Sequence, residues 1–407
     1  MREDRKRPIF SSSSILSYSL VVTVTMTMKK RMPPSSSPSI QQHFWLGLQL
    51  VLSLSVLVCV LALLRISSQS QSSASAFSSS GRSSSVEGTP KIAFLFLARS
   101  NLPLDFVWHA FFQNAEKRCY SIYIHSEPGF VFDKSTTRSP FFYGRQLNGS
   151  VKVEWGESSM VDAERLLLAA ALEDPANQRF VLISDSCVPL YNFSYIYGYL
   201  MSSSKSFVDS FLDKKEERYN PKMSPVIPKD KWRKGSQWIT LIRKHAEVVI
   251  ADNAIFQAFK RYCRRGSALD PGRKQNVKAV VQKQHDCIPD EHYVQTLLSM
   301  SDLEDKLERR TLTYTLWNQS SDDKKRQSWH PMTFEYADAS LQHINEMRNI
   351  NHVYYETEYR TEWCRCNATF VSCFLFARKF SLGAAKRLLN EGLVGSFDAS
   401  ALLFSSS

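Results

Sequence analysis

Several familiar sequence signals are missing from this chain of 407 residues. No internal repeat is visible, and no dense stripe of lysine and arginine with interleaved aromatic residues indicates binding to nucleic acid. Cys364-x-Cys366 lacks the usual zinc spacing and has no accompanying pair of histidines, which favours a structural disulfide over a metal site. These absences weigh against a repeat protein, a nucleic-acid-binding protein and a zinc module.

The composition is that of a folded protein with an uneven charge. Hydrophobic residues make up 43% of the chain and aromatic residues 12%, and the length suffices for a large α/β domain with additions. The net charge is +12, and seven of the basic residues precede the longest apolar run, against two acids. A basic tail beside an apolar run usually sets membrane topology, while a mildly basic domain suits an anionic ligand.

The longest apolar run covers residues 44–64, which are 21 residues without a charge. This length spans about 30 Å of hydrocarbon as a helix. Lys29, Lys30 and Arg31 precede the run, so the N-terminus is expected in the cytosol. A signal peptide cleaved near Ala74-Ser75-Ala76 is the alternative, but its leader and apolar core would both be too long. We expect a cytosolic tail over 1–43, a signal anchor over 44–64 and a serine-rich stem over 65–90.

The residues after the anchor carry signs of a lumenal location. Four glycosylation sequons begin at Asn148, Asn192, Asn318 and Asn367, all on the same side of the anchor. Of eight cysteines, Cys59 lies in the apolar run and the other seven follow it, where disulfides are expected. Since seven is odd, one thiol is left free or pairs between chains, and the latter would give a homodimer.

Strands and helices alternate from residue 91 onward. Strands are predicted at Lys91–Ala98, Tyr120–His125, Val151–Glu154 and Phe180–Ser184, with helices from Pro103 and over Met160–Leu172. Further strands are predicted at Gly235–Ile242, Thr311–Trp317 and Phe370–Phe376, and helices at Pro289–Met300 and Ser381–Leu389. The pattern predicts a Rossmann-like α/β domain over 91–395, followed by a C-terminal tail over 396–407. Ligands should bind at the C-terminal ends of its strands.

Seven motifs in one order resemble a known family. They are Ala98-Arg99, Tyr123–His125, Ser159–Arg165, Asp185–Leu190, Trp232–Trp238, Pro289–His292 and Cys373–Phe380. Together they resemble the plant branch of the core-2/I-branching β-1,6-N-acetylglucosaminyltransferase family, a glycosyltransferase family 14-like group. The resemblance implies a GT-A-type fold, a uridine diphosphate sugar as donor, a glycan or glycoprotein acceptor and inversion at the anomeric carbon. It also implies no cofactor and no divalent metal.

The residues after the strand Phe180–Ser184 agree with a metal-free reaction. GT-A enzymes normally hold a metal on Asp-x-Asp, whereas this chain offers Ser184-Asp185-Ser186, one carboxylate fewer. Such an enzyme would neutralise the leaving diphosphate with lysine or arginine.

The catalytic base implied by the resemblance is Glu291, in Pro289-Asp290-Glu291. An inverting transfer needs one carboxylate to take the proton of the acceptor hydroxyl. Asp290 is the second candidate. The same three residues also suit the first turn of a helix, because proline fits its backbone and acids fit its dipole.

The donor-binding residues are expected at strand ends. Arg378 and Lys379 follow an apolar strand and are candidates for the diphosphate, with Lys386 and Arg387 as weaker ones. The alternative for these cations is a solvated helix face. Nucleoside candidates are Arg99, His125 and Asp185; His125 could instead be structural, and Asp185 could cap the turn before Pro189.

The acceptor-binding candidates are Arg218, Trp232 and Trp238. Aromatic faces stack on the C–H face of a sugar and arginine bonds its hydroxyls, although Trp238 could equally be a core residue.

Three hypotheses for the function follow. The first is transfer of N-acetylglucosamine from its uridine diphosphate at the Golgi membrane. The second is the same machinery with another donor, such as glucuronic acid, acting on plant proteoglycans. The third is a catalytically silent lumenal scaffold that binds glycans.

Overall fold

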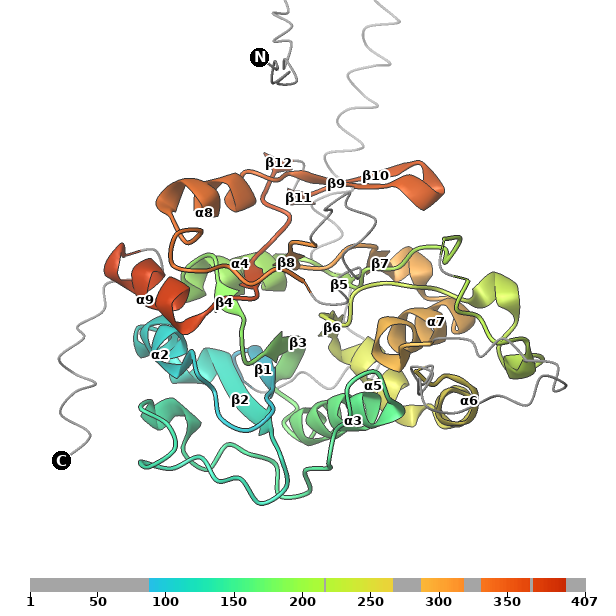
Figure 1. The fold of residues 1–407 in the computed structure, drawn as a ribbon, viewed down its shortest axis with the longest axis horizontal. Coiled ribbons are helices and arrows are strands. Elements are labelled where there is room, and N and C mark those ends of the chain that lie inside the picture. Colours follow the sequence, from blue (N-terminus) through green and yellow to red (C-terminus); the bar gives the residue numbers. More distant parts are fainter. Residues whose placement is uncertain (1–87, 216, 266–286, 318–330, 367–368, 393–407) are drawn as a thin grey trace, which may run out of the picture. The chain divides into compact units, whose positions relative to one another are not determined.

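A six-stranded sheet organises the part of the chain that the computed structural model describes, namely residues 88–215, 217–265, 287–317, 331–366 and 369–392 (Figure 1). Its strands, in spatial order, are β2 (Tyr120–His125), β1 (Lys91–Leu97), β3 (Asn177–Ser184), β6 (Thr240–Ile242), β5 (Ser206–Phe207) and β7 (Leu307–Glu308). β1 pairs in parallel with β2 and β3, and β6 is antiparallel to β3. The predicted mixed α/β fold with a largely parallel sheet is confirmed.

Strand β1 is buried on both faces, as its uninterrupted apolar sequence predicts. Side chains alternate between the faces of a strand, so Phe94 and Phe96 pack into one core and Ala93 and Leu95 into the other. The first core includes residues of α2 (Asp105–Gln113), α4 (Phe193–Ser202) and α9 (Leu382–Asn390). The second includes residues of α3 (Ser158–Leu172), α5 (Arg243–Ala251), α6 (Ala254–Tyr262) and α7 (Tyr293–Met300).

A smaller sheet lies next to the end of β3. Its strands are β4 (Val188–Pro189), β13 (Phe376–Arg378) and β8 (Thr313–Thr315), with β13 in the middle. The other described strands and helices are β9 (His352–Tyr355), β10 (Arg360–Trp363), β11 (Arg365–Cys366), β12 (Thr369–Phe370) and α8 (Leu341–Arg348). Single 3₁₀ turns are η1 (Lys117–Cys119), η2 (Pro140–Phe142), η3 (Pro221–Met223), η4 (Lys229–Lys231), η5 (Pro289–Glu291), η6 (Glu304–Lys306) and η7 (Glu356–Glu358). Because β4 follows β3 closely, the end of β13 is brought to the C-terminal end of β3.

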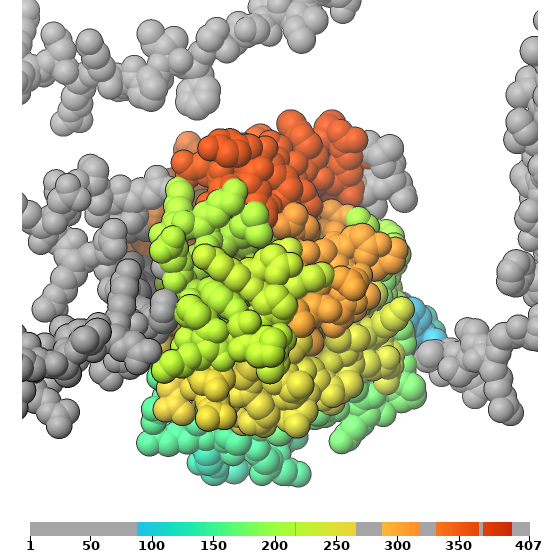
Figure 2. All heavy atoms as spheres, turned by 90° about the vertical axis from the view of Figure 1, so that its right-hand side faces the viewer, coloured from blue at the N-terminus to red at the C-terminus, as the bar shows by residue number. Residues whose placement is uncertain are grey.

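Figure 2 shows the face on which the chain around α6 (yellow), the segment before β6 (yellow-green) and the chain around α7 (orange) lie below the chain around β9 and β10 (dark orange). A disulfide between Cys263 and Cys287 joins the end of α6 to the approach to η5. A second disulfide joins Cys364 and Cys373. The predicted disulfides are therefore present, and Cys119 and Cys187 are buried free thiols.

Two predicted strands are shorter than expected or absent. Val151–Glu154 is a loop, and the Val151 N–H donates to the ring of His125 rather than to a strand. The strand predicted at Gly235–Ile242 begins only at Thr240, because Gly235 and Ser236 bond to Glu291 and Asp209 instead of continuing the β-ladder.

Two further elements are divided. The helix predicted at Pro289–Met300 is a 3₁₀ turn followed by α7, since His292 between them leaves the helical backbone region with φ −133°. The strand predicted at Phe370–Phe376 splits into β12 and β13, because the segment between them turns to form the Cys364–Cys373 disulfide.

The predicted tail, anchor and most of the stem, and the predicted C-terminal tail over 396–407, lie outside the described residues. Within the described ranges, no helix combines the length and apolar character needed to cross a membrane. Of the sequon asparagines, Asn148 and Asn192 are exposed, whereas Asn318 and Asn367 lie outside the description.

Candidate functional site

The turns that follow three parallel strands meet at one edge of the main sheet. The carbonyl of Arg99, after β1, accepts a hydrogen bond from the N–H of Glu127, after β2, at 3.0 Å. The carbonyl of Ser186, after β3, accepts from the N–H of Phe380 at 3.0 Å, which places Lys379 beside that turn. The predicted donor-binding residues therefore belong to separate segments that meet at the C-terminal ends of these strands.

This edge gathers positive charge. Arg378 is largely buried, and its guanidinium carbon lies 4.4 Å from the centroid of the Trp238 ring. Burial lowers the pKa of Arg378, while nearby Asp185 opposes this; arginine nevertheless stays protonated in proteins. Burial and the charges of Arg378 and Arg99 also lower the pKa of the Lys379 ammonium. Such mutual repulsion would be relieved by an anionic ligand.

His125 is a supporting residue of this edge. Its side chain is buried, and Nε2 accepts a hydrogen bond of 3.1 Å from the backbone of Val151. Burial lowers the pKa of the imidazole, so the ring is neutral near pH 7. The structure thus places His125 under the loop that follows β2, and this placement favours the structural role over contact with a nucleoside.

Glu291 lies at the end of η5, on a partly exposed position. Its carboxylate accepts a hydrogen bond of 2.6 Å from Arg218, and its own carbonyl accepts one of 2.9 Å from the N–H of Gly235. The Glu291 side chain is 26% exposed, whereas that of Arg218 is 11% exposed. Gly235 has no room for a side chain, because a Cβ atom would lie 1.7 Å from the carbonyl oxygen of Asp209. The carboxylate is therefore firmly held and still accessible.

Asp290 is buried directly beside this carboxylate. Burial and, next, the charge of Glu291 raise the pKa of Asp290 to about 7, while Arg218 and Arg378 oppose the rise. Because the charge of Arg378 acts on Asp290, the acids at η5 lie within electrostatic range of the basic residues at the strand ends.

Glu164 is a residue of the site that the sequence did not single out. It is buried in α3, and it accepts a hydrogen bond of 2.8 Å from the side chain of Gln237. Burial and, next, Asp290 raise the pKa of Glu164 well above its ordinary value. One signal was available: Glu164 lies at helical spacing from Val161 and Leu168, on the apolar face of the predicted helix.

The placement of Trp232 argues against its predicted role. The indole is 3% exposed, stacks on His292 at 4.4 Å between ring centroids and donates to Asp213. A buried ring between other side chains has no free face for a sugar. Trp238 is also buried, and Arg378 lies over its ring, so the structure favours the core role that the sequence left open.

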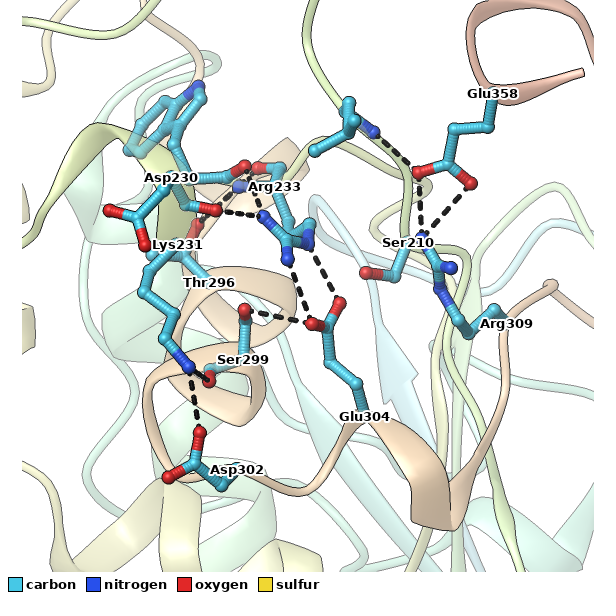
Figure 3. A network of polar contacts seen from close by, with 12 residues as sticks. Ser210, Asp230, Lys231, Arg233, Thr296, Ser299, Asp302, Glu304, Arg309 and Glu358 are labelled. Atoms are coloured by element: carbon cyan, nitrogen blue, oxygen red, sulfur yellow. Dashed lines mark hydrogen bonds and ion pairs between the residues drawn. The ribbon is translucent and has the colours of Figure 1, made fainter.

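Arg233, next to Trp232, belongs to a network of ion pairs instead of a ligand site (Figure 3). It makes two hydrogen bonds of 2.7 and 2.8 Å to Glu304, which also accepts from Ser299. In the same view Arg309 bonds both oxygens of Glu358, at 2.8 and 3.1 Å. These contacts fix loops around α7.

In the described ranges, no group of three or more histidine, cysteine, aspartate or glutamate side chains is arranged to hold a metal ion. Asp185 lies between Ser184 and Ser186, whose hydroxyls are 3.2 Å apart, and its charged neighbours include Arg378 and Lys379.

The fold and the site together define an α/β protein with an accessible carboxylate that is paired with an arginine. This carboxylate lies near the cluster of Arg99, Arg378 and Lys379 at the C-terminal ends of the strands, here called the basic strand edge. The sequence model described as Core-2/I-Branching enzyme matches residues 92–348. The chain is also 52% identical over 318 residues to a protein named glycosyltransferase BC10 from Oryza sativa subsp. japonica, which covers 77% of this chain and 80% of that protein. The chain therefore belongs to the core-2/I-branching enzyme family and is a glycosyltransferase. Glu291 and Arg218 lie inside the family match, whereas Arg378 and Lys379 follow it.

Proposed function

We propose that this glycosyltransferase has a GT-A-type fold and transfers a sugar from a nucleotide diphosphate donor to a glycan hydroxyl with inversion. N-acetylglucosamine from its uridine diphosphate is the proposed donor, and a glycan or glycoprotein is the proposed acceptor. The observation that carries the proposal is the position of Glu291, which is accessible, held by Arg218 and electrostatically close to the basic strand edge.

In the proposed reaction, Glu291 accepts the proton of the acceptor hydroxyl as that oxygen forms a bond to the anomeric carbon. The bond between the anomeric carbon and the diphosphate oxygen breaks, and the diphosphate leaves with the electron pair. The proton is then released from Glu291 to solvent. The hydrogen bond from Arg218 orients the carboxylate before the reaction.

The leaving diphosphate would be stabilised by the basic strand edge. Arg378 is fixed over Trp238, and Lys379 lies beside the turn after β3. Both cations are partly desolvated, so each would gain more from a phosphate oxygen than it would in water. This charge supports a reaction that proceeds without a divalent metal.

The proposed location is the Golgi membrane, with residues 44–64 as a type II anchor and the catalytic domain in the lumen. The basic residues before the anchor support this orientation. The exposed positions of Asn148 and Asn192, and the two disulfides, are compatible with the secretory pathway.

A donor panel tests the proposal. Purified protein is incubated with UDP-N-acetylglucosamine, UDP-glucuronic acid and other UDP-sugars, with and without a chelator, and release of UDP is measured with a glycan acceptor. We expect release with UDP-N-acetylglucosamine that persists in chelator. Preference for glucuronic acid would replace the donor, loss of activity in chelator would overturn the metal-free reaction, and inactivity with every donor would favour a glycan-binding scaffold.

A further inference from the structure

Two buried acids, Asp290 and Glu164, lie near Glu291, and neither forms an ion pair with a lysine or arginine in the described part of the chain. Asp290 is 7% exposed and Glu164 is 3% exposed. Oδ1 of Asp290 has no hydrogen-bond partner among the described residues, and the side-chain bond found for Glu164 comes from the neutral amide of Gln237. The two acids come from η5 and α3, which pack against each other.

Such an arrangement is costly for two negative charges. A carboxylate removed from water is stable only when a cation or several N–H groups compensate its charge, and otherwise it takes up a proton. Two neighbouring acids then titrate as a coupled pair, which loses its first proton more easily than its second. In agreement, burial and the neighbouring acids raise the pKa values of both groups, that of Asp290 to about 7.

The position of this pair connects it to catalysis. Asp290 directly precedes Glu291 in η5, and Gln237, which bonds Glu164, lies two residues after Gly235, which bonds the Glu291 backbone. The same short loop therefore holds both the proposed base and the acid behind it.

We propose that Asp290 is a proton-controlled charge partner of Glu291, with Glu164 as the second buried acid beside it. The inference rests on the proposed function of Glu291. Asp290 and Glu164 are positioning residues in this scheme. Neither contacts the substrate, and the pair holds the same number of protons before and after each transfer.

The ionised form of Asp290 would support transfer. The guanidinium of Arg218 lies 2.6 Å from the Glu291 carboxylate, and its positive charge opposes the arrival of the acceptor proton there. A negative charge on Asp290, the preceding residue of η5, offsets part of this opposition during transfer. The charged groups that set the titration of Asp290 are Glu291 in the same turn, Arg218 from the loop before η3 and Arg378 from β13. Glu164 from α3 is the second buried acid near it, and the charge of Asp290 raises the pKa of Glu164.

The test is the pH dependence of transfer in Asp290→Asn and Glu164→Gln, with Glu247→Gln, an exposed acid on α5, as the matched control. Wild type should lose activity as the pH falls through about 7. Asp290→Asn should lack this step and lose about 3- to 10-fold in kcat at pH 8, with little change in KM for the donor. Glu164→Gln should leave the step at the wild-type pH, because Glu164, whose pKa the charge of Asp290 raises well above its ordinary value, is still protonated when Asp290 titrates. The control should follow wild type.

A profile of Asp290→Asn that superimposes on that of wild type would overturn the inference. A second measurement is independent of activity: infrared difference spectra between pH 6 and pH 8 should show one carboxylic acid that titrates in wild type and is missing in Asp290→Asn. In Glu291→Gln the same acid should titrate at lower pH, because the charge that raises its pKa is removed. Absence of this band from wild type would also overturn the inference, even in an inactive chain. The proposed function fails separately, if no donor is turned over or if Glu291→Gln remains fully active.

Discussion

Glu304 receives two hydrogen bonds from Arg233 and one from Ser299 (Figure 3), whereas Asp290 has a buried oxygen without a hydrogen-bond partner in the described part of the chain. Both are acids near arginine in the same domain. For Glu304, burial alone would raise the pKa, but the bonds from Arg233 hold it below its ordinary value. For Asp290, burial and Glu291 prevail over Arg218 and Arg378, and the pKa rises.

The difference separates structural charges from those available for chemistry. A bidentate arginine compensates Glu304 almost completely, and the same holds for Arg309 and Glu358. The charges around Glu291 are not compensated in this way. Asp290 has no ion pair in the described part of the chain, and the charges of Arg378 and Lys379 repel each other. Strongly shifted groups of this kind concentrate at active sites, because a reacting substrate completes the missing compensation.

The largest expected effect is that of Glu291→Gln. Without a carboxylate to accept the proton, transfer should fall by about 10²- to 10⁴-fold. The glutamine oxygen can still accept from Arg218, so the midpoint of thermal unfolding should stay close to that of wild type. Steady-state UDP release and a thermal melt measure the two quantities. Wild-type turnover in this variant would show that another residue is the base. The contrast between a catalytic acid at Glu291 and a structural acid at Glu304 would then fail.

Arg378→Gln should have the next largest effect. It removes a positive charge from the basic strand edge, and we expect kcat/KM for the donor to fall by about 10²- to 10³-fold. Lys244→Gln, on the exposed side of α5, removes the same charge far from the site and serves as control. Equal activity of the two variants would show that Arg378 is a core residue stacked on Trp238 and no more.

Glu304→Gln should lower the stability of the protein and leave its turnover unchanged, which is the opposite of what Glu291→Gln should do. Loss of the ion pair leaves Arg233 with an incompletely satisfied guanidinium, and the free energy of unfolding should fall by about 2–3 kcal/mol at pH 7. The folded-state pKa of Glu304 is depressed, so its contribution is present above the ordinary value of 4.5 and is lost as the pH falls through the folded-state value. Urea unfolding at pH 7 and pH 3 measures this. Turnover per folded molecule should be unchanged, and a loss of turnover without a loss of stability would contradict the structural role.

The sequence predicts the central sheet well because its signals are local. Continuous apolar runs are typical of strands buried on both faces, and β1, β2 and β3 are found where these runs predict them. Glu291 could be named because its motif is short and continuous. Glu164 could have been found, since an acid on the apolar face of a predicted helix is unusual.

The rest depends on contacts between distant segments, which no local pattern contains. The bond between Arg218 and Glu291 joins positions 73 residues apart. Arg218 was predicted to bind acceptor, and its hydrogen bond to the proposed base was not foreseen. Trp232 is an aromatic residue of the kind that stacks on sugars, but His292 covers its ring. This contact becomes visible only when the packing of the segment after η5 is known. Short strands such as β13 were misplaced because a disulfide, not the apolar pattern, sets where the chain turns.

Asp290→Asn should have the smallest effect of these variants. The informative quantity is the direction in which its stability relative to wild type changes with pH. The folded-state pKa of about 7 is above the ordinary value of 3.8, so the folded state holds a proton that the unfolded state has lost between these values. Stability associated with protonated Asp290 is complete below about pH 4 and is lost as the pH rises through 7. The asparagine variant escapes this loss, so its stability relative to wild type should increase by about 1–2 kcal/mol between pH 5 and pH 8.

This pH dependence is opposite to that of Glu304→Gln, whose deficit relative to wild type disappears in acid. Urea unfolding of both variants and wild type at pH 3, pH 5 and pH 8 compares the two regions directly. If Asp290→Asn shows a constant difference across this range, Asp290 does not titrate there, and the contrast between an uncompensated and a compensated acid would fail at its central residue. If the difference grows with pH as expected, the charge held beside Glu291 is one that the folded protein maintains at the expense of its own stability.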